Sequence, residues 1–281
     1  MRLDDESQGN VEDRRGAGSM LGGTGVRLGL GGTVVLLVLS VVFRQNLFAL
    51  IGAGPDAGGA PASPAAVERR QANEAELGRI AVGAFNDAQN SWAERVEGYR
   101  PAKLVLFWDE TRSGCGAAGA EMGPFYCPVD EKVYLDLGFY RELATRFGAP
   151  GQFAEAYVVA HKLGHHLQKL LGIESKVQTE QQRDPSRRNT LSVRMELQAD
   201  CFAGVWGKGA DQRHLLDPGE MEQGLAAAAA VGDDRIQKAT TGRVSPESFT
   251  HGSAEQRARW FRRGFERGDL EGCDTFAGLA P

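Results

Sequence analysis

The chain has 281 residues, with 32 Lys and Arg residues against 37 Asp and Glu residues, which gives a formal net charge of −5 at pH 7. Hydrophobic residues make up 42% and charged residues 25%, so a wholly disordered chain and a protein with many membrane spans are excluded. A net negative charge gives no global reason to expect a nucleic-acid partner, and none is predicted.

The first predicted element is a membrane helix near the N-terminus. Residues 28–43 contain no charge, and as a helix they would span about 24 Å, close to the hydrocarbon core of about 30 Å. Arg27 and Arg44 flank this run, and apolar residues resume after it, so we predict a transmembrane signal anchor over residues 28–51. A buried core helix and a cleaved signal peptide are the alternatives. Gly/Ala/Pro-rich residues 52–64 argue for a linker after an anchor.

Arginines near the predicted anchor determine its expected orientation. Arg14, Arg15 and Arg27 lie shortly before the uncharged run, and only Arg44, within the predicted segment, lies close after it. This distribution favours a cytoplasmic N-terminus. The sequence therefore predicts a cytoplasmic tail over residues 1–27, then the anchor, the linker and an extracytoplasmic domain over residues 65–281. This is the organisation of a single-pass inner-membrane protein, with the lipid bilayer as a partner of one helix.

The part of the chain after the linker is predicted to be mostly helical, with a small sheet early in the sequence. Apolar residues recur at helical spacing from Leu77 to Val96, and short strands follow over residues 103–108 and 133–137. Polar residues 174–190 are predicted to be a loop. Further helices are predicted over residues 152–171, 191–206, 217–231 and 253–268. The predicted fold class is α+β.

Three of the five histidines fall within six residues of one predicted helix. His161 and His165 are four residues apart, so both imidazoles project from one face of the helix, which is the geometry that Zn²⁺ needs. Gly164 lies beside them and lets another backbone approach. His166 points about 100° away and is interpreted as a packing or surface residue.

The next predicted helix carries two carboxylates that suit a metal site. Glu196 is a candidate third ligand, and Asp200, one turn further on, is a candidate acceptor for the outer N–H of a ligand histidine. A pair of surface carboxylates is the alternative. Flanking Phe202 and Trp206 favour burial, and a buried carboxylate needs a partner. We therefore expect one Zn²⁺ per chain, held by His161, His165 and Glu196.

The four cysteines contain no C-x-x-C pair, so a four-cysteine zinc site is not expected. An even number suits two disulfides in an oxidising compartment. One pairing joins Cys115 to Cys127 in a short loop and Cys201 to Cys273 across the C-terminal region. The sequence also allows two other pairings, and buried free thiols are a further alternative.

The sequence contains the long motifs NVEDRRG, GPFYCPVDEKVYLDLGFY, AYVVAHKLGHHLQKLLG, ELQADCFAGVW and FTHGSAEQRARWFRRGFERGDL. Together these motifs resemble the neutral zinc metallopeptidase family, a family of bacterial membrane-anchored zincins. The resemblance implies a zincin-like fold and zinc held by the two helix histidines and Glu196. It also implies hydrolysis of peptide bonds, with peptides or proteins as substrates.

Lys162 departs from the H-E-x-x-H motif of that family, because it stands where the motif has its general-base glutamate. A lysine ammonium is repelled by a nearby metal cation and cannot accept a proton as a carboxylate does. We therefore expect activity to be lower by about 10²- to 10⁴-fold, or lost. Two functions follow: a weak or inactive zinc peptidase, and a non-catalytic zinc-binding module for peptides or proteins.

Three further hypotheses concern regions outside the predicted metal site. His251, on a predicted loop, is a candidate for stabilising an oxyanion, with a capping or packing role as the alternative. The strand over residues 133–137 is a candidate edge for an added peptide strand, or an ordinary core strand. Arginines of the last helix are interpreted as a solvated face rather than a surface for nucleic acid or anionic lipid.

Overall fold

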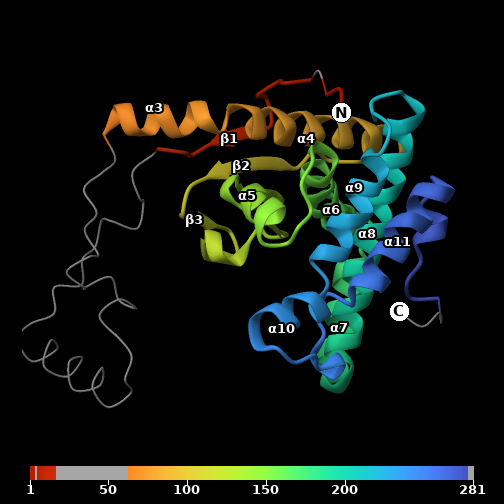
Figure 1. Cartoon of the computed structure of the whole chain (residues 1–281). Helices are drawn as coiled ribbons and strands as arrows, with labels where there is room; N and C mark the ends of the chain where they lie inside the picture. Colours follow the sequence, from red (N-terminus) through yellow and green to blue (C-terminus); the bar gives the residue numbers. More distant parts are fainter. Residues whose placement is uncertain (4, 17–62, 278–281) are drawn as a thin grey trace, which may run out of the picture. The chain divides into compact units, whose positions relative to one another are not determined.

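The computed structural model of the chain describes residues 1–3, 5–16 and 63–277 (Figure 1). The anchor predicted over residues 28–51 lies outside these residues, and none of the helices they form has the length and apolarity to span a bilayer. The chain divides into two compact units, Met1–Arg14 with Asn73–Pro281, and Arg15–Ala72. The second unit contains most of helix α3 (Pro64–Asn73), and everything below concerns the first.

A four-stranded mixed sheet with the order β1-β2-β6-β5 lies early in the first unit. Strands β1 (Val11–Asp13), β2 (Lys103–Phe107) and β6 (Lys132–Asp136) run parallel, and β5 (Phe125–Cys127) runs antiparallel to β6. A separate hairpin is formed by β3 (Glu110–Ser113) and β4 (Gly116–Gly119). The two predicted strands correspond to the central strands β2 and β6.

The prediction that residues 133–137 form the sheet edge is wrong, because β5 occupies that edge. The alternative interpretation as a core strand is correct, since Val133, Tyr134 and Leu135 are each 1% exposed. A three-residue strand such as β5 has no repeating pattern of its own, so the sequence did not reveal it.

The first residues of the chain belong to this unit and are not a separate tail. Strand β1 pairs along its whole length with β2, and Leu3 is buried in the main core. The Asn86 side chain donates hydrogen bonds of 3.0 Å to two N-terminal backbone carbonyls. The predicted boundary between a tail over residues 1–27 and the domain is therefore wrong for residues 1–14. The many charged residues of this segment suggested a solvated tail, whereas its strand is held by backbone pairing with β2.

Eight helices of the described residues complete the unit. They are α4 (Ala75–Arg95), α5 (Gly138–Thr145), α6 (Gln152–Leu170), α7 (Ile173–Arg183), α8 (Arg188–Gln212), α9 (Glu220–Ala230), α10 (Asp233–Thr241) and α11 (Ala254–Arg267). Helix α7 corrects the prediction of a loop over residues 174–190. Its only buried residue is Val177, so it lacks the apolar stripe by which a helix is recognised.

Small residues let α6, α8 and α11 pack closely, as Figure 1 shows for α8 and α11. A Cβ on Gly164 of α6 would lie 3.0 Å from the Cα of Ala199 on α8, which confirms the predicted close approach. On the other side of α8, a Cβ on Gly204 or Gly264 would overlap the backbone of the facing helix. Helix α8 is thereby held between α6 and α11, which brings their polar side chains together.

Both disulfides follow the first of the predicted pairings. Cys115 is bonded to Cys127, which joins the β3–β4 hairpin to β5, and Cys201 is bonded to Cys273, which joins α8 to the C-terminal segment. The described residues contain no free cysteine.

Candidate metal centre

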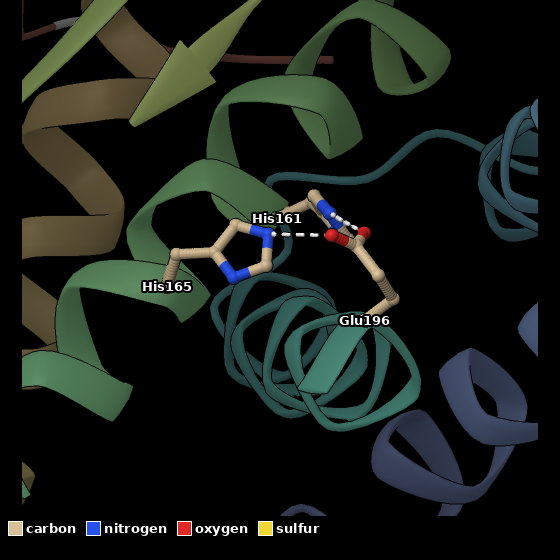
Figure 2. Close-up of side chains that lie close together, drawn as sticks. All are labelled: His161, His165 and Glu196. Atoms are coloured by element: carbon tan, nitrogen blue, oxygen red, sulfur yellow. Dashed lines mark hydrogen bonds and ion pairs between the residues drawn. The ribbon is translucent and has the colours of Figure 1, made fainter. Parts of the chain in front are cut away.

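Helices α6 and α8 bring together the three residues that the sequence predicted as metal ligands (Figure 2). Nε2 of His161 lies 3.1 Å from one carboxylate oxygen of Glu196, and Nε2 of His165 lies 3.5 Å from the other. One potential ligand atom from each residue lies within 4.8 Å of the others. The i, i+4 spacing on α6 and the close packing of α6 on α8 produce this convergence.

The outer nitrogen of each histidine is held by a buried acceptor. Nδ1 of His161 lies 2.8 Å from Oδ1 of Asp200, and Nδ1 of His165 lies 2.9 Å from Oε1 of Gln168. An imidazole that donates from Nδ1 keeps the lone pair of Nε2 free for a metal. Asp200 therefore lies where the sequence predicted it. Gln168 was missed, although a glutamine three residues after His165 and seven after His161 lies on the same face of the helix as both histidines, which is a usable signal.

The charge state of these side chains suits a divalent cation. Burial lowers the pKa of His165 to about 3, so this imidazole is neutral near pH 7. Burial opposes the charged form of Glu196, but the adjacent side chains of His165, His161 and Lys162 hold its pKa well below the ordinary value. Two imidazoles and one carboxylate form the donor set of a zinc site with an open fourth position, so these residues fit Zn²⁺.

A groove of about 450 Å³ opens beside the three residues. Its lining includes Phe125, Tyr126 and Met122 from β5 and the turn before it, and residues of α7 and α8. His165, Glu196 and Lys162 also line it. A metal held by these ligands would therefore border the groove.

Lys162 lines this groove and forms no hydrogen bond or ion pair with the described residues. Burial lowers the pKa of its ammonium, while the negative charge of Glu196 acts in the opposite direction. The residue is therefore placed beside the candidate metal ligands, as its position in the motif predicted.

His251 also lines the groove, from the loop before α11, with its side chain half exposed. Asp233 holds this loop, because its Oδ2 accepts the backbone N–H groups of Thr250 and His251, each at 2.7 Å. The other carboxylate oxygen lies 3.2 Å from Nδ1 of His251. His166 does not reach the groove: it is buried, with Nδ1 2.9 Å from the Tyr126 hydroxyl, as a packing residue should be.

Arg257 corrects the interpretation of the last helix as a purely solvated arginine face. Its side chain is buried, and its Nε donates to Asp200 at 2.8 Å. Arg257 shares a helix face with the buried residues Phe261 and Gly264, at spacings of four and seven, so periodicity alone contained the signal. Arg259 and Arg262 are exposed, as predicted.

The fold and the site together define a class of protein: a mostly helical α+β domain with a His-His-Glu candidate zinc centre beside a groove. A family model described as "Putative neutral zinc metallopeptidase" matches residues 1–276, and the chain belongs to this family of neutral zinc metallopeptidases.

Relatives share nearly the whole chain. The Escherichia coli (strain K12) "Uncharacterized protein YpfJ" is 46% identical over 279 residues, which cover 95% of each chain. The Mycobacterium tuberculosis (strain H37Rv) "Uncharacterized protein Rv2575" is 45% identical over 207 residues, which cover 70% of this chain and 69% of the relative. No solved structure matches the chain.

Proposed function

We propose that the protein is a zinc-binding member of this family that binds peptides in the groove, with hydrolysis weak or absent because Lys162 replaces the general base. The observation that carries the proposal is the convergence of His161, His165 and Glu196, of which His165 and Glu196 line the groove. His161 and His165 would hold zinc through Nε2, and Glu196 through its carboxylate. When bound, zinc polarises a peptide carbonyl and makes water more acidic.

The edge strand β5 supports peptide binding next to the candidate centre. It pairs on one side with β6 only, and its Phe125 and Tyr126 line the groove. An extended peptide adds to such an edge through backbone hydrogen bonds, with side chains alternating between the groove and solvent. His251, held by Asp233, would donate a hydrogen bond to the carbonyl oxygen where negative charge develops.

The absence of a spare carboxylate supports weak hydrolysis. Among the described residues that line the groove, the acidic ones are Glu174 and Glu196. Glu196 is a candidate ligand, and Glu174 accepts a hydrogen bond of 2.8 Å from Gln178. The general-base position of the motif is therefore occupied by Lys162, and no other groove carboxylate is free to replace it among the described residues. The ammonium of Lys162 cannot take a proton from water.

Zinc content and peptide cleavage test the proposal on the full chain as it stands and on Lys162→Glu. We expect about one zinc per chain in both, and cleavage of casein that rises by about 10²-fold or more in Lys162→Glu. Glu196→Ala serves as a control that should lose zinc. Efficient cleavage by the unchanged chain would contradict the weak-activity proposal, and absence of zinc from it would contradict the site.

A second candidate function, capture of peptides without hydrolysis, is favoured by the ammonium of Lys162, which lines the groove and has no ion-pair partner among the described residues. An ammonium beside a metal cation attracts carboxylate groups, so peptides with a free C-terminus should bind more tightly than the same peptides with a C-terminal amide. Fluorescence anisotropy of zinc-loaded protein with matched labelled peptides measures this difference. Equal affinities would leave Lys162 without a role in capture.

Membrane anchoring through residues 28–51 belongs to the same proposal. The long uncharged run within this segment and the arginines beside it support it. Fractionation of cells expressing the full chain should find the protein in membranes, resistant to high salt and released by detergent. Recovery in the soluble fraction would contradict anchoring.

A further inference from the structure

The buried ion pair between α8 and α11 lies directly behind the candidate metal centre. Arg257 is 3% exposed and Asp200 is 0% exposed. Nε of Arg257 donates to Oδ2 of Asp200 at 2.8 Å, and Nη2 donates to Oδ1 at 2.9 Å. This is a two-point contact between a planar guanidinium and a carboxylate, which fixes both position and orientation. The remaining Nη1 donates to the carbonyl of Val231 at 3.1 Å, which anchors the arginine to the end of α9.

One oxygen of Asp200 is contacted by three side chains from two helices, α6 and α11. Oδ1 accepts from the Tyr157 hydroxyl at 2.5 Å and from Arg257, and it lies 2.8 Å from Nδ1 of His161. The Tyr157 hydroxyl also accepts a hydrogen bond of 3.2 Å from Arg257. Asp200 therefore cannot rotate without breaking several buried hydrogen bonds, each of which would leave an unsatisfied polar atom.

The hydrogen bonds of this cluster make Asp200 an acceptor. Its Oδ2 accepts from Nε of Arg257, and its Oδ1 accepts from Nη2 of Arg257 and from the Tyr157 hydroxyl. A carboxylate held in this way accepts hydrogen bonds and donates none, so the facing Nδ1 of His161 is the donor. Nε2 of His161 is then left on the side of Glu196.

We propose that Arg257 and Tyr157 are positioning residues of the metal centre. They fix Asp200 so that His161 presents Nε2 to the metal in one tautomer and one orientation. This inference rests on the proposed zinc binding at His161, His165 and Glu196. A purely structural role does not need this ion pair, because well-packed apolar residues stabilise a core as well as a buried ion pair does.

Zinc affinity measured by competition with a chromophoric chelator tests the inference on the full chain. Arg257→Met should weaken binding by about 10- to 100-fold, the range typical of a lost supporting residue behind a metal ligand. Tyr157→Phe removes one hydroxyl only and should weaken binding by less. Arg263→Met is the matched control, because Arg263 lies on the same helix but donates to the carbonyl of Gly272 at 2.6 Å. It should bind zinc as the unchanged chain does.

Two further measurements separate positioning from folding. The visible spectrum of the Co²⁺-loaded protein should change in Arg257→Met and not in Arg263→Met, since the spectrum reports ligand geometry. Arg257→Lys keeps the charge but not the two-point contact, so it should restore only part of the affinity. If Arg257→Met does not fold, as judged by circular dichroism, Tyr157→Phe and Arg257→Lys provide the same comparison.

Wild-type zinc affinity and an unchanged Co²⁺ spectrum in folded Arg257→Met and Tyr157→Phe would overturn the inference while leaving the proposed function intact. Absence of zinc binding in the unchanged chain would instead overturn the proposed function, and the inference with it.

Discussion

Glu155 illustrates how a single side chain adjusts stability without any role in the site. It lies in the first turn of α6, and its Oε2 is buried without a hydrogen-bond partner among the described residues. Burial raises the pKa of this carboxyl to about 7, and the negative charge of Glu76 acts in the same direction. The folded protein therefore holds this proton more tightly than the unfolded chain does.

Glu155→Gln is expected to stabilise the protein in a pH-dependent way. The wild-type carboxyl is neutral in both states well below pH 4.5, and it progressively destabilises the fold as the pH rises from there to about 7. The substitution should raise the free energy of unfolding by about 2 kcal/mol at pH 8 and change it little at pH 4. Urea unfolding at the two pH values measures the difference. An equal effect at both would mean that the ionisation of Glu155 is not its cause.

Helices and strands differ in how well the sequence revealed them. Helix α6 and the strands β2 and β6 were predicted because their apolar residues repeat within one segment. Strands β1 and β5 have three residues each and are stabilised by pairing with β2 and β6. Such pairing cannot be predicted from the local sequence pattern. The two histidines of the candidate metal centre were predicted for the same reason as α6, since their spacing of four residues is local. Asp233 and Arg257, which act on the site from other helices, were not assigned to it.

From the close contact between α6 and α8, we predict that Gly164→Ala destabilises the protein, although alanine favours helix formation. Alanine is the better helix former by about 1 kcal/mol, so the substitution would stabilise an isolated helix. Here the new methyl group would meet Ala199 at close range and push the two helices apart. We expect a net loss of about 1–3 kcal/mol in the free energy of unfolding, together with weaker zinc binding.

The double variant Gly164→Ala with Ala199→Gly provides the control, because it removes one of the facing methyl groups. It should recover part of both losses. A Gly164→Ala variant that is more stable than the unchanged chain would show that the interface between α6 and α8 accommodates the added methyl group.

At the scale of the whole molecule, the C-terminal segment supports the site from behind through one disulfide. Cys201 directly follows Asp200, and its partner Cys273 accepts a hydrogen bond of 3.0 Å from Gln198 through its carbonyl. Gln198 in turn accepts from Gln168 at 3.1 Å, and Gln168 faces His165. Asp200, which contacts His161, and Gln168, which contacts His165, are therefore both linked to the region of the Cys201–Cys273 bond.

Removing the two disulfides separately should give different results. The Cys201–Cys273 bond has a sequence separation of 72, and replacing both cysteines with serine should cost about 4 kcal/mol of stability. It should also speed the release of zinc to a chelator. The Cys115–Cys127 bond, with a separation of 12, should cost less, about 3 kcal/mol, and leave zinc release unchanged. Identical rates of zinc release from both variants would mean that the Cys201–Cys273 bond does not support the metal site.

The pairing of β1 with β2 has a consequence for the sidedness of the protein in a membrane. Backbone hydrogen bonds between the two strands require both to be in one aqueous compartment. A single crossing by the segment between them would place residues 1–14 and 73–277 in different compartments, which is the arrangement expected from the arginine distribution. The paired sheet and that arrangement cannot exist in the same molecule.

We therefore propose that both strands face the same side, which means that the membrane attachment proposed for residues 28–51 is not a single crossing. Every described cysteine is disulfide-bonded, so single cysteines introduced at the exposed positions Gly9 and Gln182 can be labelled selectively. In intact cells, a membrane-impermeant maleimide should label both variants or neither. Labelling of only one would mean that the membrane-inserted protein lacks its first strand, and that its sheet begins at β2.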